Sequence, residues 1–452
     1  MAAKRVAIVG AGPAGLSQLR AFDLALQQDP SLELEVVCFE KQYQLGGLWN
    51  FSWRTGLDEH AELLHTSMYR NLWSNSPKET GEYRDYSFEQ HFGRPIASYV
   101  TREVMLNYIN GRMNNHPKAK EWIQFNTSVQ HIHFNSQTSQ FTVETISHTT
   151  YLKSIHHFDY VIIASGHFST PNVPEYFGFS SYPGRILHSH DFREAREFAG
   201  QNVLVIGSGY SAEDIALQCI KFGSASVVIS SRSKLGDYNW PSGINKKPIL
   251  KKMEGKYACF EDGSAVENVD AIFLCTGYLH SFPFLAEELR LKTENRMWPD
   301  GLYKGVLYEK NPQLFYLGMQ NQVYSFLMFD VQAFYVRDII LKRILLPSLD
   351  QMNSHFEGWR KREATLTTFQ DMMHFQADYV KELLFYVPDY PPVDTDAINQ
   401  MYLEWEQHKK LDLLTYRDKL FCSLVTGNRA SKHHTDWIDA TDDTLQEYLK
   451  KK

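Results

Sequence analysis

The sequence predicts an α/β fold in which parallel sheets are covered by helices on both faces, and two observations support this prediction. Residues 4–40 and 201–232 each contain an apolar strand, a glycine-rich turn, a helix and a second strand. Two further apolar runs, 160–171 and 271–278, close on a small residue and glycine, as a strand does before a tight turn. Short apolar strands that alternate with helices are typical of parallel sheets.

The first of these units begins with the apolar run RVAIVG, which leads into the turn Gly10-Ala11-Gly12-Pro13-Ala14-Gly15. In such a GxGxxG turn one glycine allows the tight turn, one lets the backbone approach a pyrophosphate and one lets the helix pack on the strand. The N-terminus of the next helix supplies unpaired N–H groups for phosphates. The second strand ends in Glu40, whose carboxylate can accept hydrogen bonds from both ribose hydroxyls and would repel a 2′-phosphate. The predicted contacts of this turn are Gly10, Gly12, Ala14 and Gly15.

The second unit has the turn Gly207-Ser208-Gly209-Tyr210-Ser211-Ala212, with alanine in place of the third glycine. Its second strand ends in Ser230-Ser231-Arg232-Ser233 and carries no acid. The guanidinium of Arg232 can pair with a 2′-phosphate, and the serine hydroxyls can add donors; a solvated surface arginine is the alternative. Opposite charges at the two ribose positions predict two different dinucleotides, FAD in the first unit and NADPH in the second.

The positions of the four segments predict the domain organisation. We expect an FAD-binding domain in residues 1–170, an NADPH-binding domain in residues 171–280, and the rest of the FAD-binding domain in residues 281–452. Residues 350–452 carry amphipathic helical patterns. The expected architecture is therefore two Rossmann-like dinucleotide-binding domains, with the NADPH domain inserted in the FAD domain and a helical C-terminal cover.

The composition argues against several other classes of protein. A net charge of −7 gives no electrostatic reason to expect a nucleic-acid partner. No apolar run approaches the about 18 residues that a membrane span needs, and the first strand begins too early for a signal peptide. The cysteines are far apart, so neither a metal site nor a redox-active dithiol is expected; they are Cys38, Cys219, Cys259, Cys275 and Cys422. We expect a soluble cytoplasmic enzyme without a membrane contact. A homodimer is one assembly compatible with the sequence.

Beyond the two units, the chain resembles the class B flavin-containing monooxygenases from end to end. Residues 46–49, GGLW, are similar to the glycine pair and tryptophan of that family. Residues 182–192 match its fingerprint F-x-G-x-x-x-H-x-x-x-[YF], with Tyr182 in place of phenylalanine, and residues 275–278, CTGY, resemble its ATGY-type turn. Five further segments resemble the bacterial trimethylamine monooxygenases: WRTGLDE (53–59), MYRNLWSNSPKE (68–79), HFSTP (167–171), SAED (211–214) and TYRDK (415–419).

The resemblance implies an enzyme that uses NADPH and molecular oxygen to insert one oxygen atom, through a C4a-hydroperoxyflavin, into a soft nitrogen or sulfur atom. Trimethylamine and its N-oxide are the leading substrate and product, with sulfides and indole as further substrates. The resemblance implies flavin contacts at Glu40, Gln42, Leu48, Trp49, His65, Val129 and Gln320. It implies NADP contacts at Trp73, Asn75, Asn172, Ser208, Tyr210, Ser211, Arg232, Ser233 and Arg417.

Asn75 is the predicted catalytic polar group, because its amide can both donate and accept hydrogen bonds without adding charge. Tyr210 is the second candidate. The alternatives are an asparagine that caps the loop beside Pro77 and an aromatic residue of the core. For the substrate pocket, Val323 stands where the resemblance places a tryptophan that lines the amine pocket. Trp405 either closes that pocket or lies on the core face of a helix.

Two other functions are compatible with these patterns. A Baeyer–Villiger monooxygenase acts on ketones, but its fingerprint ends in a tryptophan followed by proline or aspartate, whereas Phe192 and Arg193 stand here. A flavoprotein that senses redox state without turnover would hold a flavin that does not respond to NADPH. A panel of amines and ketones separates the first alternative from an N-oxygenase.

Overall fold

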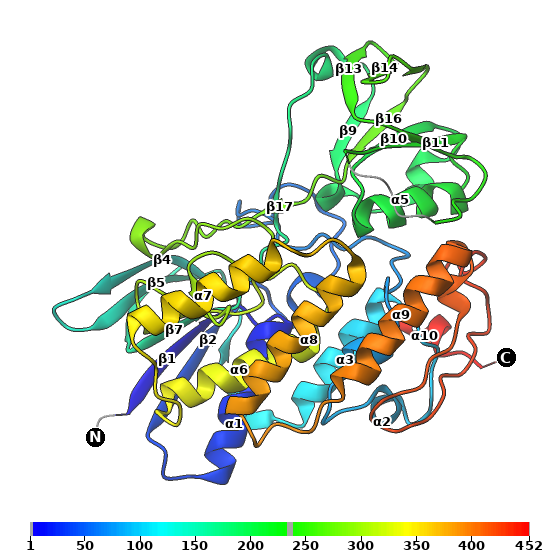
Figure 1. Cartoon of the computed structure of the whole chain (residues 1–452). Helices are drawn as coiled ribbons and strands as arrows, with labels where there is room; N and C mark the ends of the chain where they lie inside the picture. The colour runs from blue at the N-terminus through cyan, green and yellow to red at the C-terminus, as the bar shows by residue number, and fades with distance from the viewer. Residues whose placement is uncertain (1–2, 233–237, 452) are drawn as a thin grey trace.

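The computed structural model describes residues 3–232 and 238–451 (Figure 1). Its larger sheet is built from both ends of the chain. The strands are β1 (Lys4–Val9), β2 (Leu34–Phe39), β3 (Ile123–Gln124), β7 (Tyr160–Ile163), β18 (Leu302–Tyr303), β19 (Leu307–Tyr308) and β20 (Leu314–Tyr316). They lie in the order β18-β19-β20-β7-β1-β2-β3, and the pairs from β20 to β3 are parallel.

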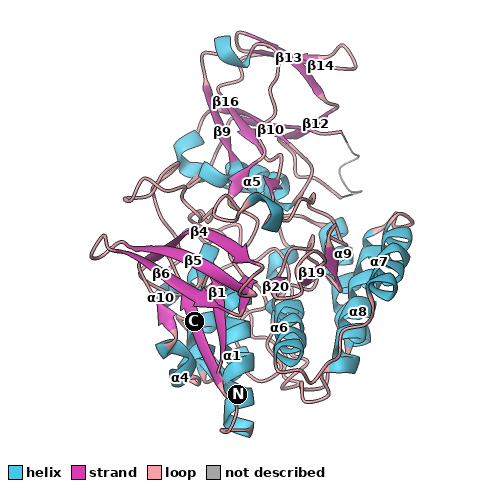
Figure 2. Ribbon diagram, turned by 90° about the vertical axis from the view of Figure 1, so that its left-hand side faces the viewer, coloured by secondary structure: helices cyan, strands magenta, loops and turns pink. Residues whose placement is uncertain are grey.

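The second sheet contains five parallel strands. They are β9 (Arg185–His188), β10 (Asn202–Ile206), β11 (Ser226–Ser230), β12 (Ile244–Lys247) and β16 (Ala271–Leu274). Their order is β12-β11-β10-β16-β9, and α5 (Tyr210–Lys221) connects β10 to β11. Figures 1 and 2 show this sheet at one end of the molecule, with α5 on the side that faces the larger sheet. The prediction of an α/β fold with two Rossmann-type parallel sheets is confirmed.

The chain passes between the sheets twice, at neighbouring points. Strands β8 (Thr170–Pro171) and β17 (Tyr278–Leu279) pair antiparallel with each other. The segment between them contains the second sheet and a small antiparallel sheet of β13 (Leu250–Glu254), β14 (Tyr257–Phe260) and β15 (Ala265–Val266). A third antiparallel sheet, of β4 (Thr127–Asn135), β5 (Gln140–Ser147) and β6 (Lys153–Phe158), precedes the first passage. The exact domain boundaries at 170 and 280 stay a prediction.

Helices cover the larger sheet and extend toward the C-terminus. They include α1 (Pro13–Gln28), α3 (Arg102–Asn114), α6 (Phe326–Ile340), α7 (Leu349–Glu363), α8 (Phe369–Tyr386), α9 (Thr395–Leu411) and α10 (Leu445–Tyr448), with the short α2 (Phe88–Phe92) and α4 (Pro117–Glu121). Across the described part of the chain, no helix combines the length and the apolar composition needed to cross a bilayer.

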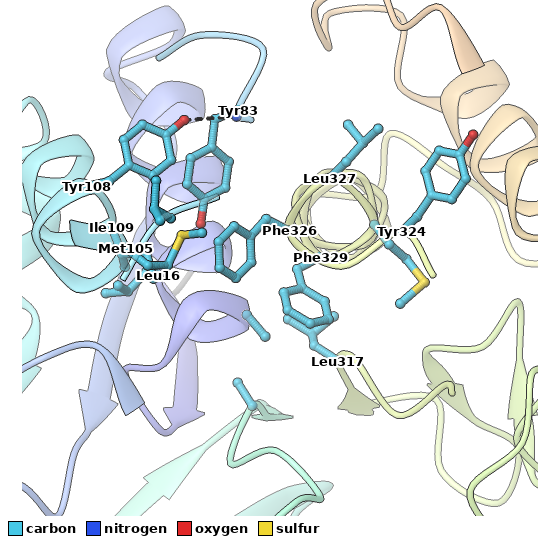
Figure 3. Close-up of a cluster of buried hydrophobic side chains, with 14 of the residues drawn as sticks. Leu16, Tyr83, Met105, Tyr108, Ile109, Leu317, Tyr324, Phe326, Leu327 and Phe329 are labelled. Carbon is cyan, nitrogen blue, oxygen red and sulfur yellow. Dashed lines mark hydrogen bonds between the residues drawn. The ribbon is translucent and has the colours of Figure 1, made fainter. Parts of the chain in front are cut away.

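Helix α6 is a core element that begins before the predicted helical region. Every one of its 15 residues is buried. Figure 3 shows Phe326 and Phe329 projecting from it into a cluster that contains Leu16, Tyr83 and Leu317. The rings of Phe326 and Tyr83 are stacked, with centroids 5.5 Å apart. This packing joins the C-terminal helices to the sheet that begins the chain, so residues from both ends can build one site.

Candidate active site

A cavity of about 1260 Å³ is lined by residues from distant parts of the chain. Its lining comes from the ends of β1, β2 and β7, from the first turns of α1 and α5, and from α6, α8 and α9. Ligands bind parallel α/β sheets at the carboxyl ends of the strands, which is where these residues lie. The volume exceeds the roughly 300–1,000 Å³ of a site for one drug-sized ligand.

The first glycine turn is packed too tightly for any side chain at two positions. A Cβ atom on Gly15 would lie 2.0 Å from the carbonyl oxygen of Gly10. Gly10 itself has a φ of +102°, and a Cβ there would lie 2.9 Å from the carbonyl oxygen of Ala164. Helix α1 then begins at Pro13 without a side-chain cap. Its first N–H groups are thus available to an anion at the cavity wall.

Glu40 lies at the end of β2, beside this turn, and is 4% exposed. Its Oε2 accepts a hydrogen bond of 2.7 Å from the backbone N–H of Ala11, and its Oε1 accepts one of 2.9 Å from that of Gln42. Burial raises the pKa of the Glu40 carboxyl, and these two hydrogen bonds oppose the shift. Each carboxylate oxygen can accept a further hydrogen bond, and Glu40 lines the cavity.

The second glycine turn has no room for a side chain at Gly207 but has room for one at Gly209. Gly207 has a φ of +140°, and a Cβ there would lie 2.2 Å from the carbonyl oxygen of Cys275. A Cβ on Gly209 would meet no atom within 4 Å, and Gly209 lines the cavity. Helix α5 begins at Tyr210 without a side-chain cap. The start of α5 can therefore present backbone N–H groups to a phosphate, and Gly209 allows close backbone approach.

Arg232 is exposed and follows the end of β11. Glu40 directly follows β2, whereas Arg232 stands two residues beyond the end of β11, so Ser231 is the residue that corresponds to Glu40 in the second unit. The pairing of Arg232 with a 2′-phosphate stays a prediction. Ser233 lies outside the described residues.

Most predicted site residues line this cavity. They are Gly10, Gly12, Ala14, Glu40, Gln42, Leu48, Trp49, His65, Trp73, Asn75, Val129, Ser208, Tyr210, Ser211, Val323 and Trp405. Burial lowers the pKa of His65 to about 4, so this imidazole is neutral at physiological pH. Among the described residues, those predicted for the site that do not line the cavity are Gly15, Asn172, Gly207, Arg232, Gln320 and Arg417.

Three of these residues lie outside the cavity lining and form hydrogen bonds or an ion pair with the protein. Asn172 is exposed, and its Nδ2 donates to the carbonyl oxygen of Thr276 at 3.2 Å. Gln320 is fully buried, and its Nε2 donates to the carbonyl oxygen of Gly305 at 3.1 Å. Arg417 is 2% exposed and forms a 2.5 Å ion pair with Asp214. Their predicted cofactor contacts stay predictions.

The two catalytic candidates differ in exposure. Asn75 is half-buried, and among residues 3–232 and 238–451 its side-chain amide makes no hydrogen bond to the protein. A loop-capping role for Asn75 is therefore not seen. Tyr210 is 43% exposed, so it is not a core residue, and its ring centroid lies 6.1 Å from that of Trp405.

Val323 lines the cavity beside three aromatic residues, Phe369, Tyr402 and Trp405. These four residues are called the aromatic corner below. Trp405 is 3% exposed, so it lies in the core and also lines the cavity. The carbonyl oxygen of Val323 accepts a 2.6 Å hydrogen bond from the hydroxyl of Tyr402, one turn before Trp405 on α9. Sequence analysis missed two aromatic residues of this corner, Tyr402 and Phe369. Helical spacing along α9 places Tyr402 on the face of Trp405 and could have identified it.

His188 connects the end of β9 to the turn that follows β16. Its Nε2 donates to the carbonyl oxygen of Gly277 at 3.0 Å, and its Nδ1 accepts from the backbone N–H of His190 at 3.0 Å. Burial lowers the pKa of His188 to about 4. Both ring nitrogens are thus engaged in fixing the passage between the sheets.

Comparisons with known proteins agree with this geometry. The flavin-binding monooxygenase-like family model matches residues 3–239 and 241–393. A trimethylamine monooxygenase of Methylocella silvestris is 51% identical over 452 residues, which cover 98% of each chain. The crystal structure of Tmm from a Pelagibacter species superposes with a TM-score of 0.95 at 48% identity, over 99% of this chain and all of that one. S-allyl-L-cysteine S-oxygenase from Allium sativum superposes with a TM-score of 0.79 at 26% identity, over 92% of this chain and 95% of that chain.

The two glycine turns, the uncapped helix starts and the opposite charges of Glu40 and Arg232 fit two dinucleotides of different kinds. The chain therefore belongs to the flavin-binding monooxygenase-like family, and it is a flavin-containing monooxygenase that uses FAD and NADPH.

Proposed function

We propose that this enzyme oxygenates small tertiary amines at nitrogen, with trimethylamine as the leading substrate and trimethylamine N-oxide as its product. The observation that carries the proposal is the aromatic corner of Val323, Phe369, Tyr402 and Trp405, which adjoins the start of α5 through Tyr210. Aromatic walls suit a compact amine, which offers little to hydrogen-bond. Relatives that are 51% identical carry the name trimethylamine monooxygenase.

The proposed reaction balances with one equivalent of each reactant. Amine, oxygen, NADPH and a proton give amine N-oxide, water and NADP⁺. Bound FAD would supply the redox chemistry between NADPH and oxygen. The substrate contributes the nitrogen lone pair that forms the new N–O bond, so no side chain has to act as a nucleophile.

The chain's own residues bind, orient and exclude water. Glu40 accepts hydrogen bonds from ribose hydroxyls in the first turn, and Arg232 pairs with a 2′-phosphate beyond the second. The amide of Asn75, which has no hydrogen-bond partner within residues 3–232 and 238–451, donates to or accepts from groups at the reacting centre. The aromatic corner keeps water from this part of the cavity.

Val323 makes this pocket wider than one closed by a tryptophan, so we also propose activity on larger sulfides and on indole. The 26% identity and high structural similarity to a plant S-oxygenase support sulfide oxygenation. A smaller side chain at position 323 removes contact area that a compact amine would need. The same change makes room for an aryl group.

Substitution of Val323 tests this proposal. Wild type, Val323→Trp and the control Val323→Leu are compared on trimethylamine, a bulky aryl methyl sulfide, indole and a cyclic ketone. Val323→Trp should shift the ratio of kcat/KM values toward trimethylamine and away from the sulfide by about tenfold or more, equivalent to about 1.4 kcal/mol. Val323→Leu, which adds no ring, should shift it much less.

Two results would contradict the proposal at different levels. An unchanged ratio in Val323→Trp would show that position 323 does not contact substrate. Conversion of the ketone to an ester by wild type, without amine oxygenation, would replace the proposed function with a Baeyer–Villiger reaction.

A further inference from the structure

Two neighbouring carboxylates lie near the start of α5, one at the end of its first turn and the other directly after it, beside the place proposed for the phosphates of NADPH. Glu213 and Asp214 are 7% and 5% exposed, and both line the cavity. Carboxylates near a helix N-terminus stabilise the helix, but they would repel a pyrophosphate bound at the same end. A nucleotide site at this turn therefore requires that both charges be neutralised by the protein.

Each carboxylate has a buried cation as its partner, and both cations come from the C-terminal part of the chain. The Nζ of Lys409, on α9, lies 2.7 Å from Oε2 of Glu213, and the lysine side chain is fully buried. The guanidinium of Arg417 lies 2.5 Å from Oδ1 of Asp214, and its side chain is also fully buried. These pairs hold the start of α5 to a segment about 200 residues further along the chain.

Lys409 also lies among aromatic rings of the cavity wall. Its Nζ is 4.8 Å from the ring centroid of Trp405 and 5.3 Å from that of Tyr210, both of which line the cavity. The rings of Tyr238 and Tyr416 lie 4.8 and 5.7 Å from the same atom. An ammonium in this environment attracts the ring faces, and the attraction is strong where water is excluded. One side chain thus contacts the start of α5 and the aromatic corner together.

We propose that Lys409 is a positioning residue for the NADPH site: it neutralises Glu213, holds α5 against α9, and fixes Tyr210 and Trp405 at the cavity wall. Lys409 does not line the cavity within the described part of the chain, so it acts through these neighbours. The inference rests on the proposed placement of NADPH at the second glycine turn. It predicts that the nucleotide is retained less well when Lys409 loses its charge.

The next residue of α9 supplies a matched control. Lys410 pairs with Glu406 at 3.1 Å, but 47% of its side chain is exposed. An exposed ion pair contributes little to stability. Substituting Lys410 with methionine makes the same chemical change at the next residue of the helix, whose ammonium pairs with Glu406.

The experiment uses full-length, FAD-loaded enzyme with Lys409→Met, Lys410→Met and the double substitution Lys409→Met/Glu213→Gln. Three quantities are measured: the Kd of NADP⁺ from the perturbation of the flavin spectrum, the hydrogen peroxide formed per NADPH, and the Tm with the flavin content. Lys409→Met should weaken NADP⁺ binding by about tenfold and raise the peroxide yield, because it leaves Glu213 as an unpaired buried charge. Lys410→Met should match wild type in all three.

The double variant distinguishes two effects of losing Lys409: the unpaired charge of Glu213 and the loss of the ammonium beside the rings of Tyr210 and Trp405. It removes the unpaired carboxylate, so NADP⁺ affinity should recover in part, while the peroxide yield stays high because Tyr210 and Trp405 remain without the ammonium. If Lys409→Met alone fails to retain FAD, the double variant, which has no unpaired charge, supplies the same readout. A lower Tm with wild-type Kd and wild-type peroxide yield would overturn the inference.

Arg232→Ala distinguishes failure of this inference from failure of the proposed nucleotide site. If Arg232→Ala weakens NADP⁺ binding and Lys409→Met does not, only the role of Lys409 is wrong. If Arg232→Ala and Gly209→Ala, which places a methyl group at the turn itself, both bind NADP⁺ as wild type does, the second glycine turn is not the NADPH site and the basis of the inference is lost.

Discussion

Asn75 presents an unengaged amide to a cavity whose other walls are largely apolar or aromatic. Among the described residues its half-buried side chain has no hydrogen-bond partner in the protein. Its amide is therefore open to a ligand in the cavity. We propose on this ground that Asn75 contacts the reacting centre.

Asn75→Leu tests this assignment, because leucine has a similar volume but no donor or acceptor. Flavin reduction by NADPH should survive in part, while the yield of oxygenated product per NADPH falls and hydrogen peroxide rises. The measurement is the ratio of product to peroxide at a fixed NADPH consumption. A variant that converts NADPH to product as efficiently as wild type would show that Asn75 has only a structural role.

At the scale of elements, the second glycine turn contains two glycines with different functions. A side chain on Gly207 would collide with the backbone of Cys275, whereas one on Gly209 would meet only the open cavity. Gly207 is thus required by the fold. Gly209 is required only if a ligand approaches the turn closely.

Alanine substitution at these positions should separate folding from binding. Gly209→Ala should keep the wild-type Tm and FAD content but raise the KM for NADPH by about tenfold, since the methyl group occupies space that the pyrophosphate needs. Gly207→Ala, the comparison, should lower the Tm because its backbone is strained and its Cβ has no room. Wild-type NADPH kinetics in Gly209→Ala would mean that the nucleotide does not approach this turn.

The elements also show what a sequence can predict. Both glycine turns, Glu40 and the parallel strands could be predicted because strand, turn and helix follow one another along the chain. Helix α6 could not, because all its residues are buried, including charged ones such as Asp330 and Arg337, so it has no exposed face to produce an amphipathic pattern. The partnership of Lys409 with Glu213 left no local signal, since 196 residues separate the two.

At the scale of the whole molecule, the site depends on segments that are distant in sequence. The first turn comes from the N-terminus, the second from an inserted sheet, and the aromatic corner from α8 and α9. The two parallel sheets bring the turns to one cavity, and α6 anchors the C-terminal helices beside it. Motifs predicted each turn separately, but only the assembled fold shows that Val323, Tyr210 and Trp405 line the same space.

We propose that this assembly transfers one oxygen atom from molecular oxygen to an amine and oxidises NADPH in the same turnover. The decisive experiment supplies FAD-loaded enzyme with NADPH, trimethylamine and oxygen-18 gas, and then quantifies labelled N-oxide by mass spectrometry alongside the NADPH consumed. We expect one oxygen-18 atom in each N-oxide molecule and close to one N-oxide per NADPH, with no product when NADPH is omitted. Unlabelled N-oxide, or NADPH consumption that yields only hydrogen peroxide whether or not the amine is present, would contradict it.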